Sequence, residues 1–142
     1  MNQIEKKLRF INFIVKSIKY NSTTIFNNLK NLKFKRYPII LKFKIRDIKS
    51  AFFVIIEKDS INISSELKIK RKVNCFITIN RAKTLHNLLK GRILPTAISL
   101  IGKVSINADN KKYIPIFYTI ITSTKKSYNE IIKGTRFTLV EK

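Results

Sequence analysis

The first residues of the chain have the hydrophobic spacing of an amphipathic helix. Apolar side chains recur at alternating steps of four and three, which places them along one helical stripe; they are Ile4, Leu8, Ile11, Val15 and Ile18. The stripe is widened by Phe10, Phe13 and Ile14 beyond what one neighbouring helix covers. A polar stretch at residues 21–24 then offers an N-cap for a second short helix that ends before Pro38. Two helices are therefore predicted at the start.

At residue 39 the period of the hydrophobic pattern changes to two, which is the period of a β-strand. Four strands are predicted in succession, at residues 39–45, 51–56, 61–69 and 73–79. Short polar turns separate them, and such turns join neighbouring strands. We therefore expect these four strands to form an antiparallel meander.

Beyond residue 80 the pattern predicts mostly helix. Asn80 can cap a helix that ends at Gly91, where glycine favours a C-terminal stop. A second helical segment is expected at residues 92–101 and a fifth strand at 103–108. The last helix is predicted by helical spacing at Ile114, Phe117, Tyr118 and Ile121.

These elements predict an α+β fold. Several strands carry Lys, Arg, Asn and Ser on one face, so the helices must all pack on the other face. The result is a two-layer sandwich with a five-stranded, mainly antiparallel sheet and an open polar back. We expect one domain over residues 1–124, followed by a short polar C-terminal tail over residues 125–142.

The composition is strongly basic, and its origin is open. The 142 residues carry a net charge of +22, which is typical of proteins with anionic partners. However, Lys outnumbers Arg 23 to 7, and Ile (26) and Asn (13) are abundant too. All three enriched types have codons made of A and T alone, whereas phosphate binding favours Arg. Codon bias is therefore the favoured source of the charge.

Composition and pattern exclude several classes of protein. The longest apolar runs, 52–56 and 113–121, are shorter than the ~20 residues that cross a bilayer. Residues 1–7 lack the apolar block of a signal peptide. The chain has a single cysteine, which excludes an internal disulfide framework. We expect a cytoplasmic location.

No set of residues forms a recognisable catalytic or metal-binding motif. His86 is the only histidine and is expected on the exposed surface of a helix, with no nucleophile or orienting carboxylate nearby. Cys75 lies on the apolar face of a strand and is expected to be buried and inert. One histidine and one cysteine cannot supply a zinc site. The sequence thus predicts no enzyme, metal or cofactor.

The helices carry more apolar surface than one layer over a sheet needs. This surplus has three interpretations: a tightly filled core, a dimer face, or a cavity for an apolar ligand. Composition alone favours the filled core, because A/T bias also supplies Ile and Phe.

Several segments resemble sterol-carrier-protein domains. The resemblance covers residues 8–122, and the segments that carry it are Lys42–Asp47, Ser64–Leu67, Asn74–Thr78, Leu85–Leu89 and Ile101–Asp109. Within these domains the helical leader and the turn lengths are most similar to bacterial accessory factors of ubiquinone biosynthesis.

The resemblance implies a non-catalytic lipid carrier. It implies polyprenylated ubiquinone precursors as ligands, bound in an apolar tunnel between sheet and helices, and ubiquinone-biosynthesis enzymes as partners. Two features depart from the family. Ala108 stands where the family has glycine in the turn after the fifth strand. Residues 125–142 are too few for the family's coiled coil, so its coiled-coil partner is not expected.

The resemblance and the pattern together give two sets of candidate residues. The expected walls of the lipid site are Phe10, Phe13, Ile14, Ile77, Ile98, Ile101, Phe117 and Ile121. Cations on the polar sheet face are expected to contact an anionic membrane surface; these are Lys42, Lys44, Arg46, Lys68 and Lys103. The alternative functions are a basic nucleic-acid-binding protein, or a protein-interaction scaffold without a pocket.

Overall fold

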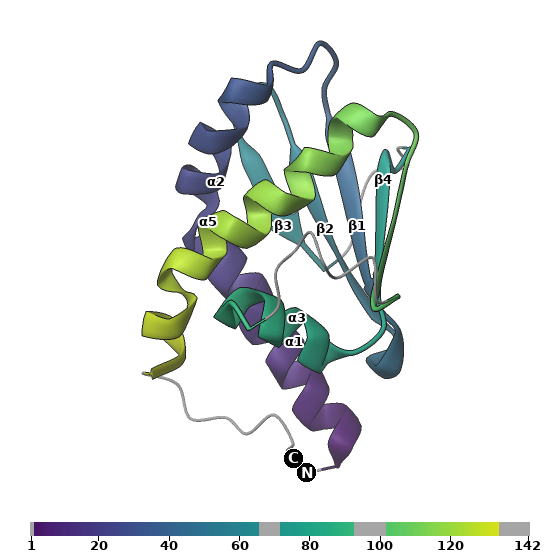
Figure 1. Ribbon diagram of the computed structural model, residues 1–142, viewed down its shortest axis with the longest axis vertical. Helices are drawn as coiled ribbons and strands as arrows, with labels where there is room; N and C mark the ends of the chain where they lie inside the picture. Colours follow the sequence, from purple (N-terminus) through teal and green to yellow (C-terminus); the bar gives the residue numbers. More distant parts are fainter. Residues whose placement is uncertain (1, 66–71, 93–101, 134–142) are drawn as a thin grey trace.

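The structure is a computed structural model that describes residues 2–65, 72–92 and 102–133. Figure 1 shows a sheet covered by helices. In chain order the elements are α1 (Gln3–Tyr20), α2 (Ser22–Leu29), the 3₁₀ turn η1 (Lys30–Leu32), β1 (Ile39–Ile45), η2 (Arg46–Ile48), β2 (Ser50–Ile56), β3 (Ile61–Ser64), β4 (Cys75–Ile79), α3 (Ala82–Lys90), β5 (Val104–Ala108), η3 (Lys111–Tyr113) and α5 (Ile114–Lys133). The predicted α+β class and five-stranded sheet are confirmed.

The strand order is β3-β2-β1-β4-β5, and β1 pairs with β4 in parallel while the other pairs are antiparallel. The predicted meander is therefore correct for β1 to β3 and wrong for β4. Alternation reports which face of a strand is buried but not which strand lies beside it. Asn74 extends the pairing of β4 with β1, because its N–H donates to the Ile40 carbonyl at 2.8 Å and its Oδ1 accepts from the Ile40 N–H at 2.9 Å.

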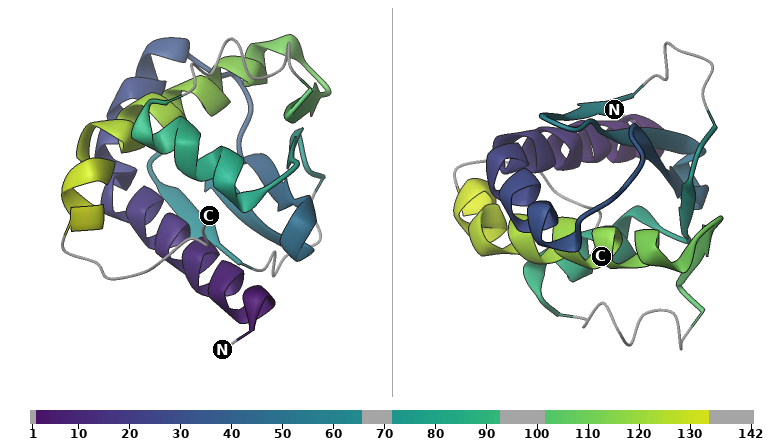
Figure 2. Two further views of the ribbon diagram at one scale, coloured as in Figure 1. Left: turned by 60° about the horizontal axis from the view of Figure 1, so that its bottom comes forward. Right: turned by 90° about the horizontal axis from the view of Figure 1, so that it is seen from above.

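Helices α1, α2, α3 and α5 lie on one face of the sheet. Seen from above in Figure 2, the sheet curves around them, so they fill its concave side. The inward positions of the strands are apolar and buried, as period-two alternation requires. The core therefore sits between the concave face of the sheet and the helices.

Polar side chains join α5 to the first two helices. Asn28 Nδ2 donates to Ser123 Oγ at 2.9 Å, and Ser127 Oγ donates to Asn21 Oδ1, also at 2.9 Å. Helix α5 continues to Lys133, and Tyr128 is buried. The stretch expected to be a polar tail after residue 124 thus begins as helix. Ser127 makes one of these contacts between helices, whereas Lys125, Lys126, Asn129 and Glu130 are exposed to solvent.

Asn80 was expected to cap the start of α3 and Gly91 to end it; the structure differs at the start and agrees at the end. Asn80 Oδ1 accepts from Thr84 Oγ1 at 2.7 Å, whereas the Ala82 N–H donates to Asp47 Oδ1 at 3.1 Å. The carboxylate that caps α3 therefore comes from η2 rather than from the preceding residues. Gly91 ends the helix with φ +81°, the left-handed conformation that glycine adopts without strain.

The turn after β5 does not need glycine. Ala108 pairs with Cys75 at the end of β5, and the non-glycine residues with positive φ in the described ranges are Lys33 and Lys49. Asp109 follows, and its N–H donates to the Asn74 carbonyl at 3.0 Å. The substitution of alanine at residue 108 is therefore accommodated by ordinary extended backbone.

Candidate functional site

Most of the expected lipid-site residues lie in one apolar cluster. Five of them come from α1, β4 and α5 and are at most 2% exposed: Phe10, Ile14, Ile77, Phe117 and Ile121. Phe13 is half-buried and packs against the same cluster. The remaining two, Ile98 and Ile101, lie outside the described residues. The structure thus brings three separated segments together between the sheet and the helices.

Stacked aromatic rings form the floor of this cluster. Phe43 and Phe52 face each other across β1 and β2 with ring centroids 4.7 Å apart and an interplanar angle of 6°. Phe117 of α5 lies 6.0 Å from Phe43. The pattern places Phe43 and Phe52 on successive predicted strands, but their contact depends on strand register, which the pattern alone does not give.

A hydrogen-bonded polar pair lies among the helices. His86 Nδ1 of α3 is 2.8 Å from the Tyr128 hydroxyl of α5. Both rings contact α1, because Phe10 lies 5.5 Å from His86 and Phe13 lies 5.8 Å from Tyr128, each edge to face. The His86–Tyr128 pair therefore joins α3 and α5 and packs against α1.

The expectation that His86 is exposed is wrong, since it is only 9% exposed. A signal for its burial was present in the sequence. Ala82, Leu85, His86 and Leu89 have the spacing i, i+3, i+4, i+7 of the buried stripe of a helix.

Burial keeps the polar pair uncharged near neutral pH. Desolvation is the largest cause that lowers the pKa of His86, to about 4, and the nearby cations Lys90, Arg92 and Lys83 lower it further. Burial also raises the pKa of the Tyr128 hydroxyl. An uncharged interior is compatible with an apolar ligand.

Cys75 is buried in the sheet, as expected. Burial raises the pKa of its thiol to about 11, and the negative charge of Asp109 contributes in the same direction. The thiol therefore stays protonated near neutral pH, and a protonated buried thiol is a poor nucleophile. Among the described residues no group of three or more His, Cys, Asp or Glu side chains is placed to hold a metal ion. Within the same ranges, no helix has the length and hydropathy of a membrane span.

The polar face of the sheet carries a cationic hollow. Three of the expected membrane-contact residues, Lys42, Lys44 and Arg46, line it together with Lys49, Ser50 and Ala51. Its volume is about 510 Å³. Lys103 does not line it, since β5 lies two strands away from β1. Lys68 falls outside the described residues.

This face is less polar than expected, because aromatic and aliphatic side chains share it with the cations. Phe76 is 45% exposed, and Phe53 and Ile55 are half-exposed on the neighbouring β2. The Lys42 ammonium lies 5.9 Å from the centre of the Phe53 ring, a cation–π contact. The outer face therefore combines positive charge with exposed apolar area.

Solved structures share this arrangement of curved sheet and helical cover. The sterol carrier protein domain 2 of Helicoverpa armigera aligns with a TM-score of 0.57 at 16% identity, over 78% of this chain and 87% of that one. The fold is that of the sterol carrier proteins. Sterol carrier protein 2 from Yarrowia lipolytica, in its apo form, aligns with a TM-score of 0.54 at 13% identity, over 79% and 89% of the two chains.

The sterol carrier fold is shared with a ubiquinone synthesis protein. The structure described as "UbiJ-SCP2 Ubiquinone synthesis protein" aligns with a TM-score of 0.52 at 12% identity, over 83% of this chain and 93% of that one. By sequence, no family model matches the chain, and no curated protein matches it. At these identities the likeness shows the fold.

Proposed function

We propose that the chain is a non-catalytic carrier that holds a polyprenylated ubiquinone precursor between its sheet and its helices. The observation that carries the proposal is the convergence of α1, β4 and α5 on one uncharged apolar cluster. The fold shared with sterol carrier proteins and a ubiquinone synthesis protein supports it. In this role the chain would deliver its ligand to the enzymes of ubiquinone biosynthesis.

Burial supplies the driving force for such binding. About 25 cal/mol per Å² over several hundred Å² of isoprenoid tail is on the order of 10 kcal/mol before costs. Association and ordering consume a large part of that energy. Apolar walls are sufficient for this chemistry, and the His86–Tyr128 pair adds no charge that would oppose it.

Filling the proposed site should displace the lipid. Ile121→Phe adds volume to a wall position of α5, so bound lipid is expected to fall roughly tenfold. Ile25→Phe makes the same change at a buried position of α2 that is not among the expected wall residues. The measurement is the amount of prenyl lipid extracted per folded chain. Equal loss in both variants would show that overpacking alone is responsible and would count against the assigned wall.

The cationic hollow on the sheet supports a second candidate function, transient contact with an anionic membrane. Four cations line it, and exposed Phe76 and half-exposed Phe53 lie on the same face. Each cation near an anionic surface contributes about 1 kcal/mol, and exposed aromatic rings favour the membrane interface. Contact through this face would let the carrier collect its ligand from a bilayer.

Reversing two charges of this hollow should abolish vesicle binding. The double variant Lys42→Glu/Lys44→Glu is expected to bind vesicles of phosphatidylglycerol and phosphatidylcholine about tenfold more weakly or worse. Lys125→Glu/Lys126→Glu changes the net charge equally at exposed positions of α5 and serves as the control. Co-sedimentation at low salt measures both. If the control variant loses as much vesicle binding, net charge and not this face is responsible. If an oligonucleotide preferentially displaces the vesicles from the protein, the nucleic-acid alternative is favoured.

A further inference from the structure

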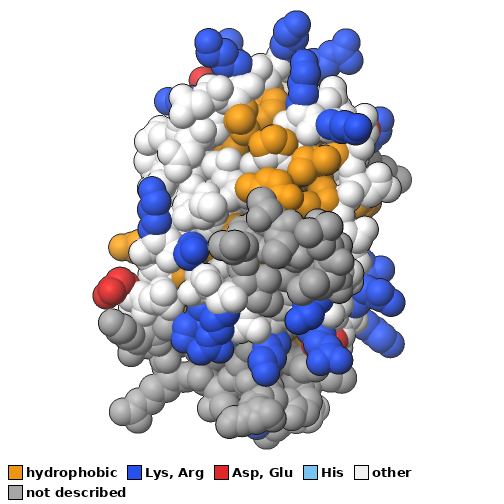
Figure 3. All heavy atoms as spheres, viewed as in Figure 1, with side chains coloured by type: hydrophobic (Ala, Val, Ile, Leu, Met, Phe, Trp, Pro, Cys, Tyr) orange, Lys and Arg blue, Asp and Glu red, His pale blue; other side chains and the backbone are white. Residues whose placement is uncertain are grey.

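A second cationic hollow lies at the end of the molecule where the chain enters β1, leaves β5 and begins α5. Its volume is about 400 Å³, within the range of small-molecule pockets. Five cations line it: Lys33, Lys35, Arg36, Lys72 and Lys112. In Figure 3, Lys and Arg side chains crowd this upper end of the molecule. The hollow shares no residue with the one on the sheet face or with the predicted lipid walls.

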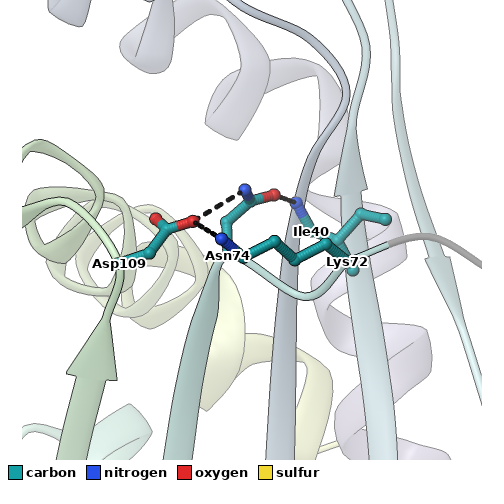
Figure 4. Close-up of polar contacts among 4 residues, drawn as sticks. All are labelled: Ile40, Lys72, Asn74 and Asp109. Atoms are coloured by element: carbon teal, nitrogen blue, oxygen red, sulfur yellow. Dashed lines mark hydrogen bonds and ion pairs between the residues drawn. The ribbon is translucent and has the colours of Figure 1, made fainter.

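The positive charge in this hollow is largely uncompensated. Asp109 is the single acidic residue in its lining, and its Oδ2 is 3.3 Å from the Lys72 ammonium and 3.4 Å from Asn74 Nδ2 (Figure 4). The other four cations make no ion pair with a side chain in the described part of the chain. Four positive charges around one hollow create a strong local attraction for a multiply charged anion.

Hydrogen bonds fix the backbone segments on one side of this hollow. Asn74 links the start of β1 to the end of β5, because it binds Ile40 through Oδ1 and Asp109 through both its carbonyl and Nδ2 (Figure 4). This places the Lys72 and Asp109 side of the hollow at a fixed distance from β1. Lys33, which also lines the hollow, has φ +48°, a left-handed conformation that is uncommon outside glycine. The chain thus turns sharply where it presents its cations.

Aromatic rings form the remaining wall. Phe34 lies 5.8 Å from Tyr113 and 6.5 Å from Tyr37, centroid to centroid. Phe34 and Tyr113 also line the hollow and pack against the hydrophobic core. A ligand in this hollow would therefore meet both cations and apolar rings.

We propose that this hollow binds a diphosphate group, with the organic part of the ligand lying against Phe34 and Tyr113. A diphosphate carries several negative charges within a few ångströms, which matches a cluster of cations with one compensated carboxylate. Arg36 can bind two phosphate oxygens at once, while the lysines act as point charges. The shared chemistry is the diphosphate; its source is either a prenyl diphosphate or a free diphosphate compound.

The direct test is calorimetric titration with inorganic diphosphate at physiological salt. The unaltered chain is expected to bind it saturably at one site. Lys35→Glu/Arg36→Glu should weaken binding at least about tenfold, because two charge-assisted contacts become repulsive. Lys125→Glu/Lys126→Glu, with the same change of net charge, should leave it within about twofold. Both pairs are exposed, so neither variant is expected to unfold the chain.

A second titration, with farnesyl diphosphate, distinguishes the two sources. If farnesyl diphosphate binds more tightly than inorganic diphosphate, and Phe34→Ala removes this difference, the hollow is assigned to a prenyl diphosphate. If the two compounds bind equally, it is assigned to a free diphosphate compound. Lack of saturable binding, or equal weakening in both charge variants, would overturn the proposal, as would binding of an oligonucleotide without binding of diphosphate. The varied residues lie outside the lipid walls, so failure here leaves the proposed lipid carriage to its own test.

Discussion

Replacing Phe117 by alanine is expected to lower the free energy of unfolding by about 3–5 kcal/mol. Phe117 is fully buried in α5 and lies 6.0 Å from Phe43 and 5.4 Å from Tyr118. Its removal loses apolar burial and leaves a cavity where α5 packs on the sheet. Urea denaturation followed by circular dichroism measures the change, on chain freed of lipid so that no ligand contributes to stability.

Phe76→Ala provides the matched control for this prediction. It removes the same side chain from the outer face of β4, where Phe76 is 45% exposed. The loss there should stay below about 1 kcal/mol. Comparable losses in the two variants would mean that α5 is not packed against the sheet through Phe117.

The second large effect is a dependence of stability on pH that His86 controls. Its pKa is about 4 in the folded chain and 6.5 as the ordinary value, so the unfolded chain binds a proton that the folded chain excludes. Stability therefore rises with pH between about 4 and 6.5 and is lost as pH falls through that window. The full contribution is about 3 kcal/mol. Among the described residues, the Tyr128 hydroxyl contacts His86, and the cations Lys83, Lys90 and Arg92 act on it electrostatically.

His86→Asn tests this assignment. Asparagine keeps a polar atom near the position of Nδ1 for the Tyr128 hydroxyl but does not titrate. Carboxylates contribute equally to the pH dependence of the unaltered protein and of His86→Asn. The difference in unfolding free energy between these two proteins should therefore change by about 3 kcal/mol between pH 7 and pH 4. A constant difference across that range would show that His86 is accessible to protons in the folded state.

Period and polarity allowed the fold class to be predicted, because each strand buries one face. The inward positions of β1 and β4 alternate as the sequence indicates, and Gly91 ends α3 where expected. The partner of β4 was not predictable in the same way. Asn74 bonds to Ile40 through its side chain at the start of the β1–β4 pairing, and the periodicity of the sequence does not indicate such a contact.

The candidate site residues likewise fall into those that periodicity predicts and those that it does not. Residues on apolar stripes, such as Ile14 and Ile121, are found in the core as the pattern requires. His86 was misplaced because residue type was given more weight than its position on the buried stripe of α3. The cationic hollow at Lys33 and Lys112 was missed because three separate segments of the chain form it, at residues 33–36, 72 and 109–113. Only the tertiary arrangement brings such residues together.

The most direct measurement for the proposed carriage of lipid is the mass of the unaltered chain in a native mass spectrum, recorded after mild purification from cells that make ubiquinone. The account predicts a chain with one prenyl lipid bound, released by organic solvent and identified by its fragmentation. A spectrum that shows only the bare chain, together with no uptake of added prenyl lipid, would contradict it and leave the cluster between sheet and helices as a filled core.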